Sequence, residues 1–306
     1  MARTSGTAGT PRMIAIDMDG TLVHTGGYVT EGNQAALRNA QQCGAHIVIA
    51  TGRRHSYARK ILSALGLHPD TVVLSSNGAV ARTFGGHLLF RRPMPLETAR
   101  WLCERLGPFR NCFVMTFDVF QALDEAEPGA LVLEELDELH SSIRSWMETN
   151  ASSIQRVQPI EDALPLDSTG NLPIQAMLCG SMKRMAQAED LLSTSHGGRL
   201  ELFRTEYPLR DLCILDMMPV GCSKGSGLEQ LLADSGLTAR DLMCLGDNWN
   251  DLPMLELAQW PVLMGNAPES LQAVARQRGW AIGSMHDDDA VADALNACFS
   301  TAEVLG

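Results

Sequence analysis

The sequence predicts an α/β fold: a doubly wound, Rossmann-like parallel-sheet core with a second, smaller α/β domain inserted into it. Four short apolar runs each end in polar or small residues, and helical stretches separate the first three. This strand–helix rhythm stops near residue 90 and resumes after residue 211. Alternating strands and helices are typical of doubly wound sheets, and the long interruption favours an insertion.

The four apolar runs are expected to be buried strands, because short β-rich runs are typical of parallel sheets. A helix is predicted over residues 30–43, with Thr30 as its N-cap, and a second over 56–65 that ends at Gly66. In such sheets ligands bind outside the carboxyl ends of the strands, where every polar motif of this chain lies. The expected strands cover residues 13–16, 46–50, 72–74 and 242–245.

The interruption contains helical and β-like pieces but no motif of comparable density. Helices are expected over 95–106, 134–148 and 182–193, and strands over 112–117 and 174–178. The core pattern resumes with a helix over 223–233 and a strand over 261–264. The predicted organisation is a disordered lead-in (1–12), a core (13–90 and 212–306) and an inserted domain (91–211).

Composition narrows the class of protein. The 306 residues carry a net charge of −12, which disfavours a nucleic-acid or anionic-membrane surface. No run approaches the roughly 18 apolar residues of a membrane helix. The eight cysteines lack zinc or C-x-x-C spacing, which predicts reduced, mostly buried thiols. With a start unlike a secretory signal, these features predict a cytoplasmic protein.

Two carboxylates follow the first expected strand, in the motif DMDGT over residues 17–21. Carboxylates this close repel, so a cation or a shared proton is expected between them. Oxygen ligands beside a phosphate suit Mg²⁺, and an aspartate can attack phosphorus directly. A calcium loop fails here because its twelfth position is Tyr28 rather than Glu. The motif therefore favours catalysis.

A second acidic turn, GDNWND over residues 246–251, follows the fourth expected strand. Asp247 could supply a further oxygen to a metal ion, while Asn250 and Asp251 orient their neighbours. A calcium loop fails again, because the twelfth position is Ala258. A helix N-cap would explain this turn alone equally well. Two acidic turns in one sheet, however, favour a shared site.

Two weaker signals complete the set. Thr51, Gly52 and Arg53 follow the second expected strand, where a hydroxyl and free backbone N–H groups suit a phosphate oxygen, although Thr-Gly before a helix is also common capping. Lys224 lies in GCSKGSG, which lacks the spacing of a Walker A loop. Alone, Lys224 would be interpreted as a solvated surface lysine. Beside the other motifs, it is a candidate point charge on a phosphate.

Together these parts assemble one phosphoryl-transfer reaction, which needs an in-line nucleophile and neutralised phosphate oxygens. Asp17 would attack, and Asp19 would protonate the leaving alcohol and then activate water. Mg²⁺ would be held by Asp17, Asp247 and the Asp19 carbonyl, with Thr51, Lys224 and backbone amides on the other oxygens. The sequence predicts a magnesium-dependent phosphate-ester hydrolase.

The motifs DMDGTL, ATGR, SSNGA, SKG and GDNWNDLPML, in this order, resemble those of the haloacid dehalogenase superfamily. More narrowly, the chain is similar to the Cof-type phosphatases of subfamily IIB, whose large α/β cap is inserted between two core segments. The segment MGNAPESLQAVA strengthens the match. The motifs cover both core segments, whereas the cap matches only in length and position.

The resemblance implies a role for each matching residue. Asp17 corresponds to the family's nucleophile, Asp19 to its acid/base and Asp247 to its metal aspartate. The hydroxyl of the second motif falls on Thr51 and the lysine on Lys224. Further phosphate contacts fall on the Met18 amide, Gly52 and Asn250, and supporting positions on Gly20, Thr21, Arg53, Asn77 and Asp251.

One segment departs from the family pattern. Relatives usually show a glycine-valine pair after an acidic turn near the end, whereas here HDDD over residues 286–289 leads into Ala290 and Val291. A second metal site and a solvated loop near the mouth of the active site would each explain it. The other histidines show no ligand spacing.

Three alternatives share the fold. A phosphomutase of the phosphomannomutase type would return the phosphoryl group to a sugar, and a non-catalytic sugar-phosphate binder would be expected to lose Asp17 or Asp19. A phosphonate or haloacid hydrolase is the third. The expected partner is a small phosphorylated metabolite, with sugar phosphates first and nucleotides or cofactor phosphates such as pyridoxal phosphate and flavin mononucleotide behind. Candidate contacts to it are Arg54, Arg204 and Arg210, and the oligomeric state is open.

Overall fold

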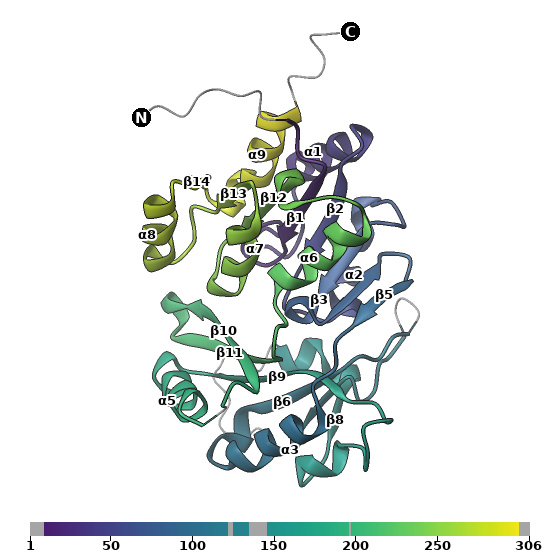
Figure 1. The fold of residues 1–306 in the computed structure, drawn as a ribbon, viewed down its shortest axis with the longest axis vertical. Coiled ribbons are helices and arrows are strands. Elements are labelled where there is room, and N and C mark those ends of the chain that lie inside the picture. The colour runs from purple at the N-terminus through teal and green to yellow at the C-terminus, as the bar shows by residue number, and fades with distance from the viewer. Residues whose placement is uncertain (1–8, 122–124, 135–145, 196, 300–306) are drawn as a thin grey trace.

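A computed structural model describes residues 9–121, 125–134, 146–195 and 197–299. Their strands form an eight-stranded and a six-stranded sheet, drawn one above the other in Figure 1. The predicted α/β fold with a doubly wound core and a second, inserted sheet is confirmed. Most of the expected lead-in (1–12) and of the expected helix over 134–148 lies outside the described residues.

The eight-stranded sheet is parallel except at one edge. Its first six strands in spatial order are parallel neighbours, and the last two add an antiparallel hairpin that was not predicted. The five predicted core strands recur to within one residue at each end. In spatial order the strands are β14 (Ala281–Ile282), β13 (Trp260–Leu263), β12 (Leu242–Gly246), β1 (Met13–Asp17), β2 (His46–Ala50), β3 (Val72–Ser75), β4 (Val80–Thr83) and β5 (Leu88–Arg91).

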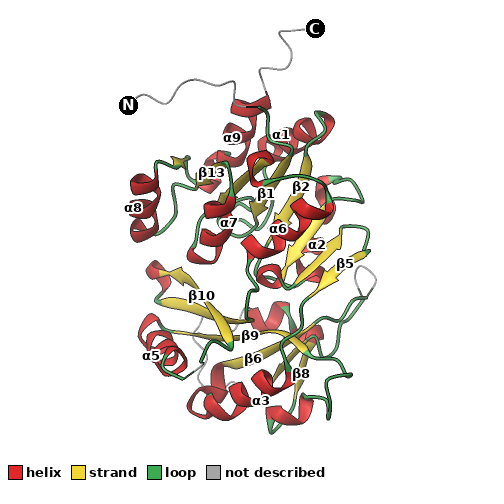
Figure 2. Cartoon of the chain, viewed as in Figure 1, coloured by secondary structure: helices red, strands yellow, loops and turns green. Residues whose placement is uncertain are grey.

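Helices cover both faces of this sheet (Figure 2). One face carries α1 (Glu31–Gln42), α2 (His55–Leu62) and α9 (Ala290–Phe299), and the other carries α6 (Lys224–Asp234), α7 (Leu252–Leu257) and α8 (Glu269–Arg278). In strand β1, successive side chains point to opposite faces of the sheet, so each face needs its own layer of helices. Ile14 and Ile16 pack with the first group of helices, whereas Met13 and Ala15 pack with the second.

Local signals set the helix ends. The Thr30 hydroxyl accepts a hydrogen bond from the Asn33 N–H at 3.2 Å, so the predicted N-cap of α1 is confirmed. Gly66 adopts a left-handed φ of +61° where the second helical segment ends, as predicted. Ser223 forms a capping box with Ser226 at the start of α6.

The six-stranded sheet is antiparallel except for one parallel pair, β7 with β8. One face is covered by α3 (Leu96–Arg105) and α5 (Met182–Ser193). In spatial order its strands are β10 (Leu200–Tyr207), β11 (Leu212–Pro219), β9 (Pro173–Gly180), β6 (Phe113–Phe117), β7 (Leu131–Leu133) and β8 (Ile154–Arg156).

Strand β11 corrects the expected boundary at residue 212. The prediction assigned residues 212–219 to the core, but they pair with β10 and β9 of the second sheet. The exposed stretch over 208–211 is the turn of the β10–β11 hairpin, with Asp211 at φ +45°. The chain therefore returns to the core after Pro219, one strand later than the sequence indicated.

Two expectations from composition can be compared with the described residues. All eight cysteines are free, and five of them are buried, as predicted. None of the described helices is both long and apolar enough to cross a bilayer.

Candidate active site

The polar motifs of the core meet at one edge of the eight-stranded sheet, because parallel neighbours end at the same edge. Asp17 ends β1 and pairs in register with Ala50, the last residue of β2. Strand β1 also pairs with β12 on its other side. Thr51 and Asp247 follow these two neighbours, so the structure brings three predicted residues together at the end of the central strand.

A buried charge cluster lies at this edge. Lys224 Nζ lies 2.5 Å from Asp17 Oδ1 and 2.6 Å from Asp251 Oδ1, and the lysine side chain is 0% exposed. The interpretation of Lys224 as a solvated lysine is therefore wrong, because two carboxylates offset the cost of burying its charge. We call Asp17, Asp19, Lys224, Asp247 and Asp251 the acidic centre.

Asp251 organises the turn over residues 246–251. Its Oδ2 accepts hydrogen bonds from the backbone N–H groups of Asp247 at 2.9 Å and Asn248 at 3.0 Å. Its Oδ1 accepts from Lys224. Because both oxygens are engaged, Asp251 fixes the turn that presents Asp247.

The Asp247 carboxylate is held closely by its neighbours. Thr21 Oγ1 donates to Oδ1 at 3.4 Å, and Asn266 Nδ2 donates to Oδ2 at 3.2 Å. Gly20 has a φ of +81°, and a Cβ there would lie 2.5 Å from Asp247 Oδ2. Only glycine suits such a position. Asn266 was missed as a site residue, although it lies in the MGNAP segment that strengthens the resemblance.

Burial makes the charges of the acidic centre costly. Desolvation raises the pKa of Asp17 to about 8, the charge of Asp251 adds to the increase, and Lys224 opposes it. The pKa of Asp247 is raised well above its ordinary value, first by burial and then by the charges of Asp17 and Asp251. Burial alone would lower the pKa of Lys224, but the two carboxylates raise it. The cluster thus has more carboxylates than Lys224 can neutralise.

The donor set fits a divalent cation. Carboxylate oxygens of Asp17, Asp247 and Asp251 all lie within 4.8 Å of one another. Hard oxygen donors suit Mg²⁺, and an ion there would offset the remaining negative charge. Asp251 already accepts from two backbone N–H groups and Lys224, so Asp17 and Asp247 are the better placed ligands. The Asp19 side chain is not in this group.

Asp19 lies at the same opening and pairs with a different cation. Arg53 Nε lies 2.5 Å from Asp19 Oδ2, and the guanidinium lies 4.2 Å from the centroid of the Tyr57 ring. The Asp19 side chain is 31% exposed, whereas that of Asp17 is 7% exposed. An accessible carboxylate beside a buried one is suited to exchanging protons with a ligand or water.

The residues expected to bind phosphate lie around Asp17. Thr51 is buried, and its hydroxyl accepts a hydrogen bond from the Arg53 N–H at 3.1 Å. Gly52, the next residue, lines a large cavity between the two sheets. The Met18 side chain is fully buried in the apolar core, so only its backbone is available to a phosphate.

A chain of amides connects the core to the second sheet. Asn250 Nδ2 donates to Asn77 Oδ1 at 3.1 Å, and Asn77 Nδ2 donates to Asp216 Oδ2 on β11 at 2.8 Å. Gln175 on β9 donates to the other Asp216 oxygen at 2.6 Å. Burial raises the pKa of Asp216 to about 6, and the two amides limit the increase. Asp216 was missed, although a lone aspartate in an apolar strand indicates a partnered charge.

A cavity of about 960 Å³ lies between the acidic centre and the six-stranded sheet. Asp17, Asp19 and Asp247 form part of its floor. Its roof consists of alternate side chains of four strands, while the side chains between them pack with α3 and α5. We call this roof the cap-sheet face; its residues are Val114, Thr116, Leu131, Gln175, Met177, Cys179, Ile214 and Asp216.

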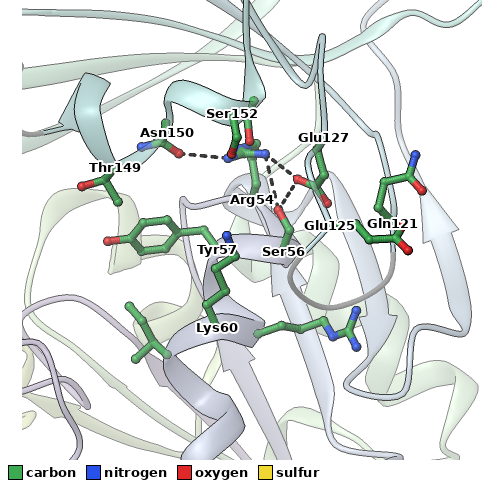
Figure 3. Close-up of a pocket in the computed structure, with 13 residues that line it drawn as sticks. Arg54, Ser56, Tyr57, Lys60, Gln121, Glu125, Glu127, Thr149, Asn150 and Ser152 are labelled. Atoms are coloured by element: carbon green, nitrogen blue, oxygen red, sulfur yellow. Dashed lines mark hydrogen bonds and ion pairs between the residues drawn. The ribbon is translucent and has the colours of Figure 1, made fainter.

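Hydrogen bonds also join the core to the six-stranded sheet and its loops elsewhere. Asn248 Nδ2 donates to the Glu206 carbonyl at 3.2 Å, and the Glu206 N–H donates to Asn248 Oδ1 at 3.2 Å. Elsewhere, Arg54 donates to Glu127 at 2.6 Å and to Asn150 at 2.9 Å, beside a pocket of about 180 Å³ (Figure 3). Figure 3 shows that these side chains converge on the Arg54 guanidinium.

The three arginines expected as ligand contacts lie in different surroundings. Arg54 lines the large cavity, but Glu127 and Asn150 hold its guanidinium. Arg204 pairs with Glu189 at 2.7 Å and with Glu206 at 2.8 Å and is not part of the cavity lining. Arg210 lines the cavity at the exposed turn between β10 and β11.

The HDDD segment, residues 286–289, is hydrogen-bonded to the loop after β1. Asp287 accepts hydrogen bonds from the N–H and the hydroxyl of Thr25, both at 2.7 Å, and Asp289 accepts from the Thr30 hydroxyl. His286 lines the cavity. The segment is thus a partly exposed loop beside the cavity, as one of the two explanations expected, and two of its carboxylates are partnered. Within the described residues, the one cluster suited to a metal ion is that of Asp17, Asp247 and Asp251.

A family comparison agrees with the motifs. Residues 14–295 match the family model of the haloacid dehalogenase-like hydrolases. The chain belongs to this family and is a hydrolase. The predicted resemblance, including its narrower Cof-type form, is confirmed.

Relatives that the chain spans almost fully are phosphatases. Phosphatase YwpJ of Bacillus subtilis is 30% identical over 285 residues, which cover 86% of this chain and 93% of that protein. The HMP-PP phosphatase of Escherichia fergusonii is 28% identical over 263 residues, covering 86% and 87%. The chloroplastic endoribonuclease YBEY of Arabidopsis thaliana is 27% identical over 288 residues, and the match spans 92% of this chain but only 45% of that longer protein.

Solved structures share the fold. A haloacid dehalogenase-like hydrolase from Bacillus subtilis superposes with a TM-score of 0.75 at 23% identity, covering 93% of this chain and 99% of its own. A sugar phosphatase of subclass IIB superposes with a TM-score of 0.69 at 19% identity, covering 94% and 98%. At these identities the likeness concerns the fold alone.

Proposed function

We propose that this hydrolase is a magnesium-dependent phosphatase that removes phosphate from small phosphate monoesters through an aspartyl-phosphate on Asp17. The observation that carries the proposal is the acidic centre, in which Lys224 holds Asp17 at the end of the central strand and below a cavity of about 960 Å³. The phosphatase relatives that the chain spans almost fully support the same activity.

Asp17 and Asp19 divide the chemistry in this proposal. A carboxylate oxygen of Asp17 forms a bond to phosphorus as the bond between phosphorus and the leaving oxygen breaks. Asp19 gives its proton to the leaving alcohol, then accepts one from the water that hydrolyses the aspartyl-phosphate. Arg53, which is paired with Asp19, positions that carboxylate.

The remaining residues of the site are assigned to binding the cation, binding the phosphate or supporting the residues that do so. Asp17, Asp247 and the Asp19 carbonyl would hold Mg²⁺, which when bound neutralises phosphate oxygens and reduces the repulsion between the carboxylates. The other phosphate contacts are assigned to Lys224, Thr51, Gly52, Asn250 and the Met18 amide. Gly20, Thr21, Asn77 and Asp251 support the site through the close packing and hydrogen bonds described above.

The inserted segment is assigned the role of a cap. Among the described residues, those between 92 and 219 carry the six-stranded sheet whose cap-sheet face covers the acidic centre, and 13–91 and 220–299 carry the core. A roof over the reacting groups keeps water away from them and contacts the leaving group. The cap would therefore select among small phosphorylated metabolites.

The test is release of inorganic phosphate from a panel of phosphate monoesters, with and without Mg²⁺. Magnesium-dependent release by the wild type, abolished in Asp17→Asn, is the expected result. Asp70→Asn is the matched control, because the Asp70 side chain is 84% exposed and does not line the cavity. It should leave the rate unchanged.

Absence of phosphate release from every ester by a folded protein that binds Mg²⁺ would overturn the proposal. Transfer of phosphate to a sugar in the presence of a bisphosphate activator would then identify a phosphomutase. Binding of sugar phosphates without any turnover would identify a non-catalytic binder.

A further inference from the structure

The HDDD segment has no part in the proposed reaction, yet it contacts two of the segments that build the acidic centre. It lies between β14 and α9, and it is where the sequence departs from the family pattern. Its backbone bonds to Asn266, whose own amide contacts Asp247. Its side chains bond to the loop over residues 25–30, which follows Asp19 in the chain. These contacts connect a partly exposed segment with the acidic centre.

Asn266 joins the HDDD segment to the residues proposed to bind Mg²⁺. Its Oδ1 accepts a hydrogen bond from the His286 N–H at 3.1 Å. Its Nδ2 donates to the Gly20 carbonyl at 2.9 Å and to Asp247 Oδ2 at 3.2 Å. An amide has its acceptor on one side and its donors on the other, so the His286 N–H determines that the donors point toward Asp247.

The backbone beside Asn266 packs directly against the residues just before the HDDD segment. The Gly265 N–H donates a hydrogen bond to the Ser284 carbonyl at 2.8 Å. A Cβ at Gly265 would lie only 2.9 Å from the Gly283 carbonyl oxygen. Because no side chain separates the two backbones at this point, a shift of the HDDD segment would move Asn266 as well.

Two aspartates of the segment hold the loop that follows Asp19. Asp287 accepts hydrogen bonds from the N–H and the hydroxyl of Thr25, both at 2.7 Å. Asp289 accepts from the Thr30 hydroxyl, which also caps α1. The start of a helix is a favourable place for a negative charge. Asp287 and Asp289 thus fix both ends of the loop over residues 25–30.

We propose that the HDDD segment positions the cation-binding groups of the acidic centre from outside it. His286 fixes Asn266, and Asn266 orients the Asp247 carboxylate. Asp287 holds the loop that continues from Asp19. The inference rests on the proposed function, in which Asp247 and the Asp19 carbonyl are Mg²⁺ ligands. Hydrogen bonds that orient a ligand favour metal binding, because the ligand is already in place when the ion arrives.

Charge offers a second explanation for the same residues, and two neighbouring aspartates separate the explanations. Three carboxylates beside the cavity would attract a divalent cation through charge alone. The Asp288 side chain is exposed and makes no hydrogen bond or ion pair within the described part of the chain, whereas Asp287 is bonded to Thr25. Alanine at either position removes one negative charge, but only Asp287→Ala breaks the contact with the loop after β1.

The test is calorimetric titration of Mg²⁺ into the full-length protein, which requires no turnover. Asn266→Ala should weaken Mg²⁺ binding about tenfold, because Asp247 loses the amide that orients it. Asp287→Ala should weaken it about threefold, and Asp288→Ala should leave it unchanged. Asn171→Ala is the matched control for Asn266, since Asn171 is exposed and does not line the cavity. It should bind Mg²⁺ as the wild type does.

Turnover shows whether these residues position the cation or act on the substrate. At saturating Mg²⁺, kcat of Asn266→Ala should stay within about threefold of wild type, because excess ion fills even a weakened site. The Mg²⁺ concentration that gives half-maximal rate should rise about tenfold. Circular dichroism without Mg²⁺ checks that each variant is folded. If Asn266→Ala is not folded, the comparison of Asp287→Ala with Asp288→Ala decides the question.

The outcomes separate this inference from the proposed function. Failure of the wild type to bind Mg²⁺ would overturn the proposed metal site and the inference with it. Wild-type Mg²⁺ affinity in folded Asn266→Ala and Asp287→Ala, with Mg²⁺-dependent turnover by the wild type, would overturn the inference alone. Equal weakening in Asp287→Ala and Asp288→Ala would show an effect of charge and would also overturn it.

Discussion

The acidic centre and the cap-sheet face border the same cavity, but they are built in opposite ways. The acidic centre buries most of its charged groups; its aspartates lie at or after the ends of parallel strands, and Lys224 is the first residue of α6. The cap-sheet face presents mainly apolar side chains from the middle of mostly antiparallel strands. A change in the acidic centre therefore removes a partner from a buried charge, whereas a change in the cap-sheet face leaves the strand pairing intact. Chemistry and selection can thus vary independently.

The two buried bases Lys224 and His55 sharpen this comparison. Burial lowers the pKa of both, but the carboxylates beside Lys224 reverse the effect. His55 lies 3.2 Å from the Thr83 carbonyl, with no carboxylate among the causes of its shift, so burial lowers its pKa to about 4. Of these two buried bases, only Lys224 has carboxylates beside it that raise its pKa and keep it charged.

The largest expected effect comes from breaking the acidic centre. In the absence of Mg²⁺, Lys224→Met should lower the free energy of unfolding by about 3–5 kcal/mol, because it leaves buried carboxylates without their cation. Urea unfolding measures this change. Lys183→Met, on the exposed side of α5, is the control and should stay within about 0.5 kcal/mol of wild type. A comparable, small change in both variants would contradict the account of a buried charge cluster.

The next effect depends on pH and concerns His55. The unfolded chain binds a proton on this side chain below about pH 6.5, whereas the folded protein does so only near pH 4. Stability should therefore be fully present above pH 6.5 and fall by about 3 kcal/mol as the pH drops to 4. In His55→Gln that loss should disappear, as measured by urea unfolding at several pH values. An unchanged slope in this variant, or a changed one in the exposed control His68→Gln, would contradict the assignment.

The difference between the acidic centre and the cap-sheet face also explains which parts of the structure could be predicted from the sequence. The strands and turns that carry the acidic centre were predictable, because apolar runs end in motifs whose residue types have few other uses. Lys224 was recognisable only beside those motifs, since nothing in GCSKGSG shows that two carboxylates lie within 3 Å of its amine. The partners of Asn77 and Asn248 come from β11 and β10. Pairing between such distant segments cannot be derived from local patterns.

The cap-sheet face was not predictable for a different reason. Its alternation could have been seen once β9 and β11 were known to be neighbours, but the apolar run over 212–219 also suits a core strand. The β4–β5 hairpin was missed in the same way, because residues 80–91 carry exposed and arginine positions typical of a sheet edge. Sequence patterns were therefore informative where chemistry constrains residue type, and weak where only packing does.

A smaller effect is expected at the joint between the two sheets. Arg54→Met should lower the free energy of unfolding by about 1.5–3 kcal/mol, because Glu127 is 4% exposed and loses its charged donor. Arg276→Met removes an exposed ion pair with Glu269 of similar length, 2.7 Å, and should cost at most about 1 kcal/mol. Thermal or urea unfolding compares them. Equal costs would show that the Arg54 contacts do not hold the cap to the core.

The smallest expected effect distinguishes backbone strain from disturbance of the acidic centre. Gly20 and Gly44 have nearly the same φ, +81° and +88°, but an added Cβ at Gly20 would clash with Asp247, whereas one at Gly44 would meet nothing within 4 Å. Gly20→Ala and Gly44→Ala should therefore share a backbone cost of about 1–2 kcal/mol. In addition, Gly20→Ala should weaken Mg²⁺ binding about tenfold, as measured by calorimetric titration, because Asp247 must move. Unchanged Mg²⁺ affinity in Gly20→Ala would mean that Asp247 is not a ligand, and the acidic centre would then have to hold its cation through Asp17 and Asp251.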